Sequence, residues 1–317
     1  MIYRMFLSLA VSSALMGTAY AAEGPQVDSR TDIRDVLAPT DLPDKAVLPE
    51  TPITFAAPDD AWRTVDPENL LIIETKYGKI GVELYPEIAP RHVAQVKTLA
   101  RQGFYNDVPF HRVIDGFMNQ TGDGSKGDGT GDSELPDIEA EFEFKRGTDM
   151  PFTAVSKQKI GQSQIGVGFY KALPIASQPS SQALWTKDNK VHAFGLHCKG
   201  VTSMARTNDP NSANSQFFLM RAKYESLDRK YSIWGSTVMG YDLLEKPLVG
   251  TVTDNPDWIP DRMDVVNIAA DLPESERPKV QVLRTEHAAF KGWLETQKQA
   301  NGLLPDVCEL SVPTRKL

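Results

Sequence analysis

Cysteine is nearly missing from this chain, which holds 2 cysteines and 5 histidines among 317 residues. A dense disulfide framework is therefore excluded, and any intramolecular disulfide would join Cys198 to Cys308. In an oxidising compartment that bond would pin the C-terminal tail to the rest of the chain; two free thiols are the alternative. His192, His197 and Cys198 lie close in sequence, but no further ligand pair repeats their spacing, so a metal site is disfavoured.

The chain also lacks an excess of positive charge and a long apolar run. Its formal net charge of -8 argues against nucleic acid as a partner. The apolar run from Met5 to Met16 is shorter than the about 20 residues that a membrane span needs. It follows Arg4 and precedes Ala19-Tyr20-Ala21, which is typical of a secretory signal peptide cleaved near Ala21. We expect an exported chain without membrane insertion after cleavage; a retained interfacial anchor is the competing interpretation.

Other familiar signatures are absent as well. The glycine-rich segment 122–132 lacks the Gly-Lys-Ser/Thr ending of a phosphate-binding loop and the ligand order of an EF-hand. We see no internal repeat and no nucleophile with a matching base that would indicate a hydrolase. We interpret the glycine-rich segment as a flexible loop.

What is present falls into four parts. After the signal peptide (1–21), residues 22–66 are rich in proline and acidic residues, which predicts an extended arm without regular structure. Residues 67–271 read as one domain, and residues 272–317 as a C-terminal extension. The hydrophobic content of 41% is ample for one sizeable core.

Local patterns predict several elements. The runs 70–75 and 80–84 flank a turn around Gly78 and indicate a hairpin, and a helix should start at Pro90 and end near Gly103. Residues 280–301 are compatible with an amphipathic helix that packs on the domain, with a partner-binding or dimerisation helix as the alternative. Its apolar residues would be Val282, Ala289, Trp293 and Leu294.

The segment at about 145–194 is rich in Ser and Gln, yet the apolar residues of 165–175 alternate in a way that predicts a hairpin. We favour an ordered, strand-containing segment over a floppy loop.

The segment FHRVIDGFMNQTGD (110–123) places one cation, Arg112, among large apolar residues. Strand alternation would put Phe110, Arg112 and Ile114 on one face, and a twist or bulge beyond the turn at Asp115-Gly116 could bring Gln120 beside them. An ordinary amphipathic hairpin with a solvated Arg112 is the competing interpretation.

A second segment, MARTNDPNSANSQFF (204–218), runs from a polar loop into an apolar strand. Together, and in this order, the two segments resemble the signature segments of the cyclophilins, the peptidyl-prolyl cis-trans isomerases. The resemblance runs from about Leu70 to about Val266 with one long interruption, so it implies an insertion at about 145–194, which we expect to reshape one edge of the substrate groove. The sequence Met-Ala-Arg-Thr looks more like that of bacterial members. The resemblance implies a mainly β fold, a closed eight-stranded antiparallel barrel capped by two helices, with no cofactor. With the signal peptide, it implies a periplasmic enzyme acting on proline-containing segments of client proteins.

The resemblance also implies the site residues. Arg112 and Gln120 fall on catalytic positions. The other matching positions are assigned to substrate binding: His111, Phe117, Met118, Ala205, Arg206, Thr207, Asn214, Gln216, Phe218, Leu227 and Tyr231. The chain departs from the family at Asp115, Thr121 and Tyr231, and at Ser226, where animal members usually carry a tryptophan that contacts cyclosporin. We therefore expect weak cyclosporin binding.

The chemistry expected of such a site is selective binding of a twisted amide. Rotation about an X-Pro bond crosses a barrier of about 20 kcal/mol without making or breaking a bond. A guanidinium has donors only, so Arg112 could donate to the proline nitrogen as it becomes pyramidal. A cyclophilin-fold peptide-binding or chaperone module with little turnover is the alternative function.

Overall fold

The computed structural model describes residues 56–160, 163–255 and 257–317. The expected signal peptide and residues 22–55 of the expected arm lie outside these described residues. None of the helices within the described ranges has the length and apolar character needed to cross a bilayer.

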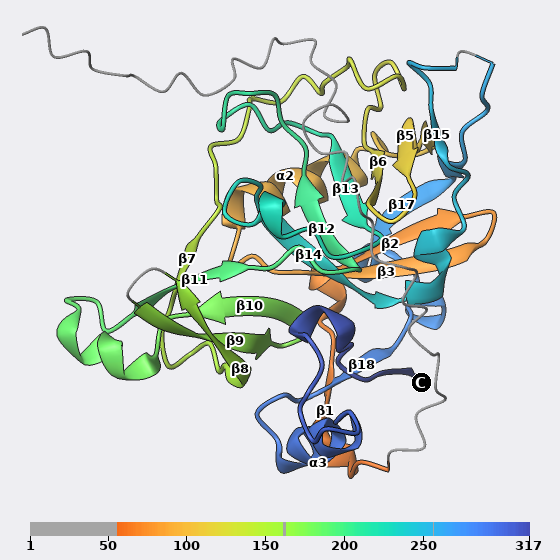
Figure 1. The fold of residues 1–317 in the computed structure, drawn as a ribbon. Coiled ribbons are helices and arrows are strands. Elements are labelled where there is room, and N and C mark those ends of the chain that lie inside the picture. Colours follow the sequence, from red (N-terminus) through yellow and green to blue (C-terminus); the bar gives the residue numbers. More distant parts are fainter. Residues whose placement is uncertain (1–55, 161–162, 256) are drawn as a thin grey trace, which may run out of the picture. The chain divides into compact units, whose positions relative to one another are not determined.

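A curled nine-stranded antiparallel sheet forms the centre of the described chain (Figure 1). The strand order is β15-β5-β6-β13-β12-β14-β3-β2-β17. In chain order these strands are β2 (Leu70–Thr75), β3 (Gly78–Leu84), β5 (Arg112–Ile114), β6 (Met118–Thr121), β12 (Val201–Met204), β13 (Phe217–Met220), β14 (Ile233–Met239), β15 (Gly250–Thr251) and β17 (Val265–Ile268).

The hairpin and helix predicted near the start of the domain are confirmed. β2 pairs with β3 across a tight turn in which Gly78 takes a positive φ of 131°, a conformation that side chains rarely adopt. Helix α2 (Pro90–Arg101) starts at its proline and buries Val93, Val96 and Leu99. Its apolar stripe packs on the same cluster as β2 and β3.

The predicted closed barrel of eight strands is not what the strand pairing shows. The main sheet has nine strands, because β15 adds a further edge beside β5, and it ends at β17. Short interruptions separate β4 (Val108–Pro109) from β5 and β16 (Arg262–Met263) from β17. β4 and β16 pair with each other and form a separate two-stranded sheet. Among the described residues of 67–271, α2 is the one α-helix. The prediction of a second helix capping the barrel is therefore wrong.

The insertion is ordered and rich in strands, as predicted. Its five-stranded sheet has the order β7-β11-β10-β9-β8. The strands are β7 (Phe144–Arg146), β8 (Thr153–Ile160), β9 (Ser163–Tyr170), β10 (Leu173–Ser177) and β11 (Val191–Gly195). The predicted hairpin is β9 and β10, which pair from Gly166–Ser177 to Tyr170–Leu173 and bury their apolar residues. A 3-10 turn, η3 (Ser180–Trp185), joins β10 to β11.

The two ends of the described chain build a third sheet, with the order β1-β18-β19. The strands are β1 (Trp62–Thr64), β18 (Val280–Leu283) and β19 (Thr314–Lys316). β1 therefore lies within the segment that composition predicts to lack regular structure. The helix predicted for 280–301 is only partly right, because Val282 lies in β18 and the helix is α3 (Ala288–Thr296). The partners of β18 are distant in sequence, so no local pattern could reveal it.

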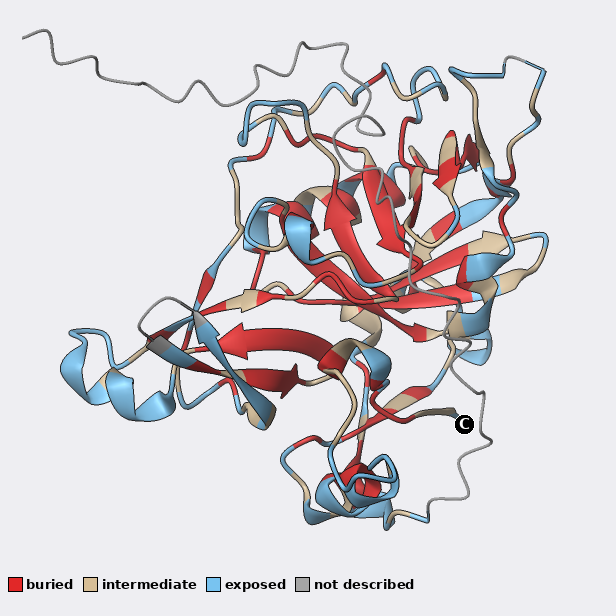
Figure 2. Ribbon diagram, viewed as in Figure 1, coloured by how far each residue is buried: buried red, intermediate tan, exposed pale blue. Residues whose placement is uncertain are grey.

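Figure 2 shows that most of the strands in the main sheet are buried. Buried side chains form two clusters, and alternate residues of β2 divide between them, so the clusters lie on opposite faces of the main sheet. The first, here called the inner cluster, joins α2 to Leu71, Val82, Phe217 and Trp234. The second, here called the shared cluster, joins the other face of the main sheet to the insertion and to the C-terminal extension. Its members include Met118 and Phe218 from the main sheet, Phe169 from the insertion, and Val282 and Phe290 from the extension.

Candidate functional site

One row of side chains crosses three neighbouring strands of the main sheet. Arg112 on β5 pairs with Gln120 on β6, and Gln120 pairs with Phe218 on β13. Directly opposite residues in antiparallel strands point to the same face, so these three side chains share one face of the sheet. Met118, two residues before Gln120, lies on this face too. We call this set, Arg112, Met118, Gln120 and Phe218, the arginine face.

Phe110 does not belong to that face, contrary to the expectation from simple alternation. It packs in the inner cluster, whereas Ile114 packs against the shared cluster. Phe110 and His111 lie between β4 and β5 and belong to neither strand, so the period of two is broken there. The alternation holds from Arg112 onward.

A chain of side-chain amides holds the arginine in place. Arg112 donates from Nη1 to Oε1 of Gln120 at 3.1 Å. Gln120 donates from Nε2 to Oε1 of Gln216 at 3.2 Å. Gln216 in turn donates from Nε2 to the carbonyl oxygens of Gly129 (3.0 Å) and Gly131 (2.8 Å). Because a guanidinium can only donate, each amide in the series has a defined orientation.

The glycine-rich segment at the end of this chain is a structured loop organised by Asp123, which sequence analysis did not assign to the site. The Asp123 carboxylate is 1% exposed and accepts backbone N–H groups of Ser125, Lys126, Gly129 and Gly131 at 2.8–3.2 Å. Burial raises the pKa of Asp123, but the backbone donors outweigh it and hold the pKa well below its usual range. Both carboxylate oxygens thus serve the loop backbone, and the predicted flexible loop is instead internally bonded.

His111, predicted to adjoin the substrate, is 3% exposed, and Gly129 lies against its ring. Neither ring nitrogen has a hydrogen-bond partner among the described residues. Burial lowers the pKa of His111 to about 4, with Asp123 opposing and Arg112 adding to the shift. The ring is therefore neutral at pH 7.

The predicted apolar binding residues gather at the shared cluster. Met118 (2% exposed), Phe218 (5%) and Leu227 (4%) are buried in it, and Phe117, Ala205 and Tyr231 pack against it partly exposed. The Phe218 ring meets Tyr231 edge-on at 5.6 Å and stacks on His197 at 6.2 Å. These contacts fix the aromatic walls beside the arginine face.

His197 is a second residue that sequence analysis did not assign to binding. Its Nδ1 lies 2.8 Å from a carboxylate oxygen of Asp228 and its Nε2 lies 2.9 Å from Oγ of Ser203. Burial lowers the pKa of His197, and Asp228 opposes this. Its ring packs on that of Phe218. No sequence signal reveals it, because Ser203 and Asp228 are brought to it by the fold alone.

Three other predicted residues lie in loops with their side chains engaged. Arg206 stacks its guanidinium on Tyr231 at 4.7 Å and donates to the Lys230 carbonyl. Thr207 is exposed and shares a hydrogen bond with Ser212. The Asn214 side chain is buried and is bonded to residues 133, 135 and 137, so it holds a neighbouring loop.

Positions where the chain departs from the family resemblance have local roles. Thr121 is fully buried and donates from its hydroxyl to the Pro109 carbonyl at 2.9 Å. Asp115 accepts from Arg221 at 3.4 Å. Ser226 is exposed in the 3-10 turn η4 (Glu225–Leu227).

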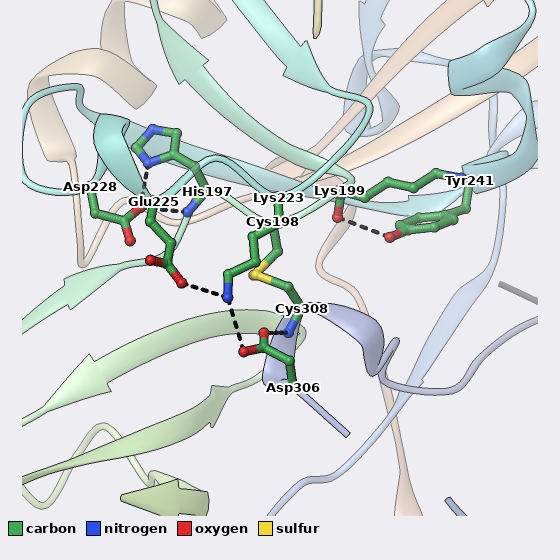
Figure 3. Close-up of a disulfide and its surroundings, with 9 residues drawn as sticks. All are labelled: His197, Cys198, Lys199, Lys223, Glu225, Asp228, Tyr241, Asp306 and Cys308. Atoms are coloured by element: carbon green, nitrogen blue, oxygen red, sulfur yellow. Dashed lines mark hydrogen bonds and ion pairs between the residues drawn. A yellow bond between two sulfur atoms is a disulfide. The ribbon is translucent and has the colours of Figure 1, made fainter. Parts of the chain in front are cut away.

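The two cysteines form a disulfide, which the sequence left open. Cys198, before β12, is bonded to Cys308 in the 3-10 turn η8 (Val307–Glu309), and their Cα atoms are 4.8 Å apart (Figure 3). Cys198 is therefore not a thiol ligand for a metal with His192 and His197.

The chain is similar in sequence to a known protein family and to curated relatives. Residues 70–269 match the family described as cyclophilin type peptidyl-prolyl cis-trans isomerase/CLD. A probable peptidyl-prolyl cis-trans isomerase of Brucella suis is 35% identical over 200 residues, which cover 60% of this chain and 76% of that relative. The counterpart from Brucella abortus is 34% identical over the same length.

A solved structure extends the likeness beyond the family region. The cyclophilin AquaCyp293 from Hirschia baltica superposes with a TM-score of 0.71 and 38% identity, covering 80% of this chain and 93% of that chain. That share exceeds the part spanned by residues 70–269, so the solved relative has counterparts of some residues outside it. The chain belongs to the cyclophilin-type peptidyl-prolyl cis-trans isomerase family.

Proposed function

We propose that this protein accelerates rotation about X-Pro bonds in exported or folding proteins, with Arg112 donating a hydrogen bond to the proline nitrogen. The observation that carries the proposal is the series Arg112, Gln120 and Gln216, which fixes one guanidinium beside an apolar wall. A donor held in advance costs no reorganisation when the amide twists.

The hydrogen bond from Arg112 is strong only when the rotating amide is near its twisted state. In the planar amide the nitrogen lone pair is conjugated and accepts poorly, whereas near the twisted state it is localised and can accept from Arg112. The contact therefore strengthens at the transition state, which is the requirement for raising turnover. Gln120 holds the guanidinium and presents its amide to the substrate carbonyl.

The apolar residues have a different task. Met118, Phe218 and Leu227, with Phe117, would hold the proline ring while the preceding carbonyl turns. Ala205, Arg206 and Thr207 would contact the flanking peptide, and Gln216 would position Gln120. No cofactor takes part in this mechanism.

The test is the variant Arg112→Ala. We expect kcat/KM for a prolyl peptide to fall about 100-fold or more, as when a single transition-state donor is removed. Exchange NMR on the peptide measures it without a coupled protease. Arg262→Ala, at an exposed arginine on β16, is the matched control and should keep full activity. Full activity in Arg112→Ala would refute the mechanism.

The departures at Ser226 and Tyr231 favour testing the alternative of a peptide-binding module. Peptide affinity is measured in the same samples by NMR titration. Wild-type protein that binds prolyl peptides without accelerating exchange would establish the binding module instead.

We also propose that the mature chain is periplasmic. The Cys198–Cys308 disulfide supports this, because disulfides persist in oxidising compartments. Cell fractionation with N-terminal sequencing should recover a chain starting near Ala22. The exposed Ser226 supports weak cyclosporin binding, which calorimetry measures; ordinary family affinity would contradict it.

A further inference from the structure

A cavity of about 240 Å³ lies beside the arginine face, and three separate parts of the chain line it. Phe194 comes from β11 of the insertion, and Val307 and Cys308 come from the C-terminal tail. Lys223 and Arg229 come from the loop that follows β13. Since the insertion and the tail supply much of its lining, the cavity is a product of these additions to the domain.

The cavity is separated from the arginine face by one layer of side chains. His197 lines the cavity and stacks on Phe218 of the arginine face. Glu225 and Asp228 line it as well, and between them in sequence lies Leu227, which packs beside Phe218 in the shared cluster. His197 and the turn around Leu227 therefore connect the cavity to the arginine face.

The apolar part of the lining, here called the base, comprises Phe194, Leu196, Val307 and the Cys308 half of the disulfide. This base suits an apolar side chain. At about 240 Å³ the cavity is smaller than the about 300–1,000 Å³ of small-molecule pockets, and its size fits one large side chain.

The charged groups at the rim are already matched to one another. The Lys223 ammonium lies between Glu225 (2.5 Å) and Asp306 (2.9 Å), as Figure 3 shows. Arg229 pairs with Glu143 at 2.5 Å and covers the Phe194 ring at 5.4 Å. Because Lys223 and Arg229 already have carboxylate partners, we expect the apolar base rather than the charged rim to decide what binds.

We propose that this cavity, here called the second subsite, takes a large apolar side chain, such as Phe or Leu, from the same polypeptide whose X-Pro bond lies on the arginine face. The inference rests on the proposed function and adds a sequence preference to it. The disulfide keeps the tail side of the cavity in place, so the preference belongs to the oxidised protein.

The test uses a series of peptides in which one phenylalanine is placed at successive positions. The parent is a twelve-residue Gly/Ser/Ala peptide with a single Ala-Pro bond; in each derivative, one residue within four of that bond becomes Phe. Exchange NMR gives kcat/KM for each peptide with wild-type protein. We expect one position, or two adjacent ones, to exceed the parent about tenfold.

The matched variants are Gln158→Trp and Lys157→Trp. Both residues are exposed on β8, but Gln158 lines the cavity, whereas Lys157 is absent from its lining and, by strand alternation, points to the other face. The Gln158→Trp ring should fill the cavity and bring the favoured-to-parent ratio to about one. Lys157→Trp should keep it near tenfold. Circular dichroism and thermal melting confirm that both fold.

The outcomes separate the two proposals. Wild-type turnover of the parent with no favoured position, or a preference that survives Gln158→Trp, overturns the second subsite and leaves the isomerase intact. Failure to turn over the parent counts against the proposed function. The same Phe walk, read as NMR affinities in wild type and Gln158→Trp, then still decides the second subsite.

Discussion

The main sheet and the parts added to it differ in how the chain specifies them. In the main sheet, the arginine face comes from β5, β6 and β13, and two of these are neighbours in sequence. The insertion and the terminal sheet are joined to the main sheet by the shared cluster, by a disulfide and by a few polar contacts between distant residues. The candidate site of the main sheet could be predicted from local motifs, whereas the contacts of the insertion and the tail depend on residues that are distant in sequence.

Variants at the contacts between the additions and the main sheet show whether the additions stabilise it. The first contact is a bidentate pair in which Arg63 of β1 donates to Glu83 of β3 at 2.6 and 2.7 Å. Both side chains are largely buried, with 14% and 4% exposed. Breaking a buried pair from one side costs about 3–5 kcal/mol, because it leaves an unpaired buried charge.

The largest effect is therefore predicted for Arg63→Met. We expect urea unfolding to show about 4 kcal/mol lower stability. Arg63→Met combined with Glu83→Gln should recover part of the loss, because the buried charge is removed. A single variant as stable as wild type would mean that the Arg63–Glu83 pair does not stabilise the fold.

The disulfide is the second contact, and its loss should cost somewhat less. Cys198 and Cys308 are separated by 110 residues, and removing a native disulfide typically costs about 2–5 kcal/mol. We expect Cys198→Ser with Cys308→Ser to lose roughly 3 kcal/mol in thermal unfolding. Reductant should lower the stability of wild type similarly and leave the double variant unchanged; a reductant effect on the variant would contradict the assignment.

The same contrast explains how far the sequence could be read. The β2–β3 hairpin and α2 were predictable because their turn, proline and apolar spacing are local. β18 was mistaken for the start of a helix because its partners, β1 and β19, are remote in sequence. Likewise, the closed barrel carried over from the family resemblance did not anticipate the edge strand β15.

The site divides in the same way. Arg112 and Gln120 were predicted from the first motif and Gln216 from the second, and the structure brings the three side chains into one hydrogen-bonded series. Asp123 was missed because its role is to collect N–H groups from a loop whose path no pattern shows. His197 was missed because it acts through Ser203 and Asp228.

The next prediction concerns how the buried His111 makes the stability of the fold depend on pH. His111 has a pKa of about 4 when folded and about 6.5 when unfolded, so the unfolded state binds the proton more readily. The neutral ring's contribution is complete above pH 6.5 and is lost as pH falls toward 4, a difference of roughly 3 kcal/mol. His111→Phe should flatten urea stability between pH 7 and 4. An unchanged slope would show that His111 is not protonated on unfolding. A residual slope is expected from His197 and from carboxyls such as Asp123, whose pKa values are also lowered in the folded state.

The smallest effect is predicted where the insertion meets the core through polar groups. Glu87, which follows β3, accepts from the Tyr170 hydroxyl and from the Lys171 ammonium, both at 2.6 Å. The carboxylate is about a quarter exposed, so solvent weakens the contact. A double-mutant cycle with Glu87→Gln and Tyr170→Phe should give a coupling energy of about 1 kcal/mol by urea unfolding. Glu87→Gln with Tyr77→Phe, whose hydroxyl bonds Asp261 instead, is the matched cycle and should give none. Tyr170 and Ile88, the neighbour of Glu87, are already buried in the shared cluster. A coupling well above this value would therefore mean that polar contacts, rather than apolar packing, fix the insertion on the core.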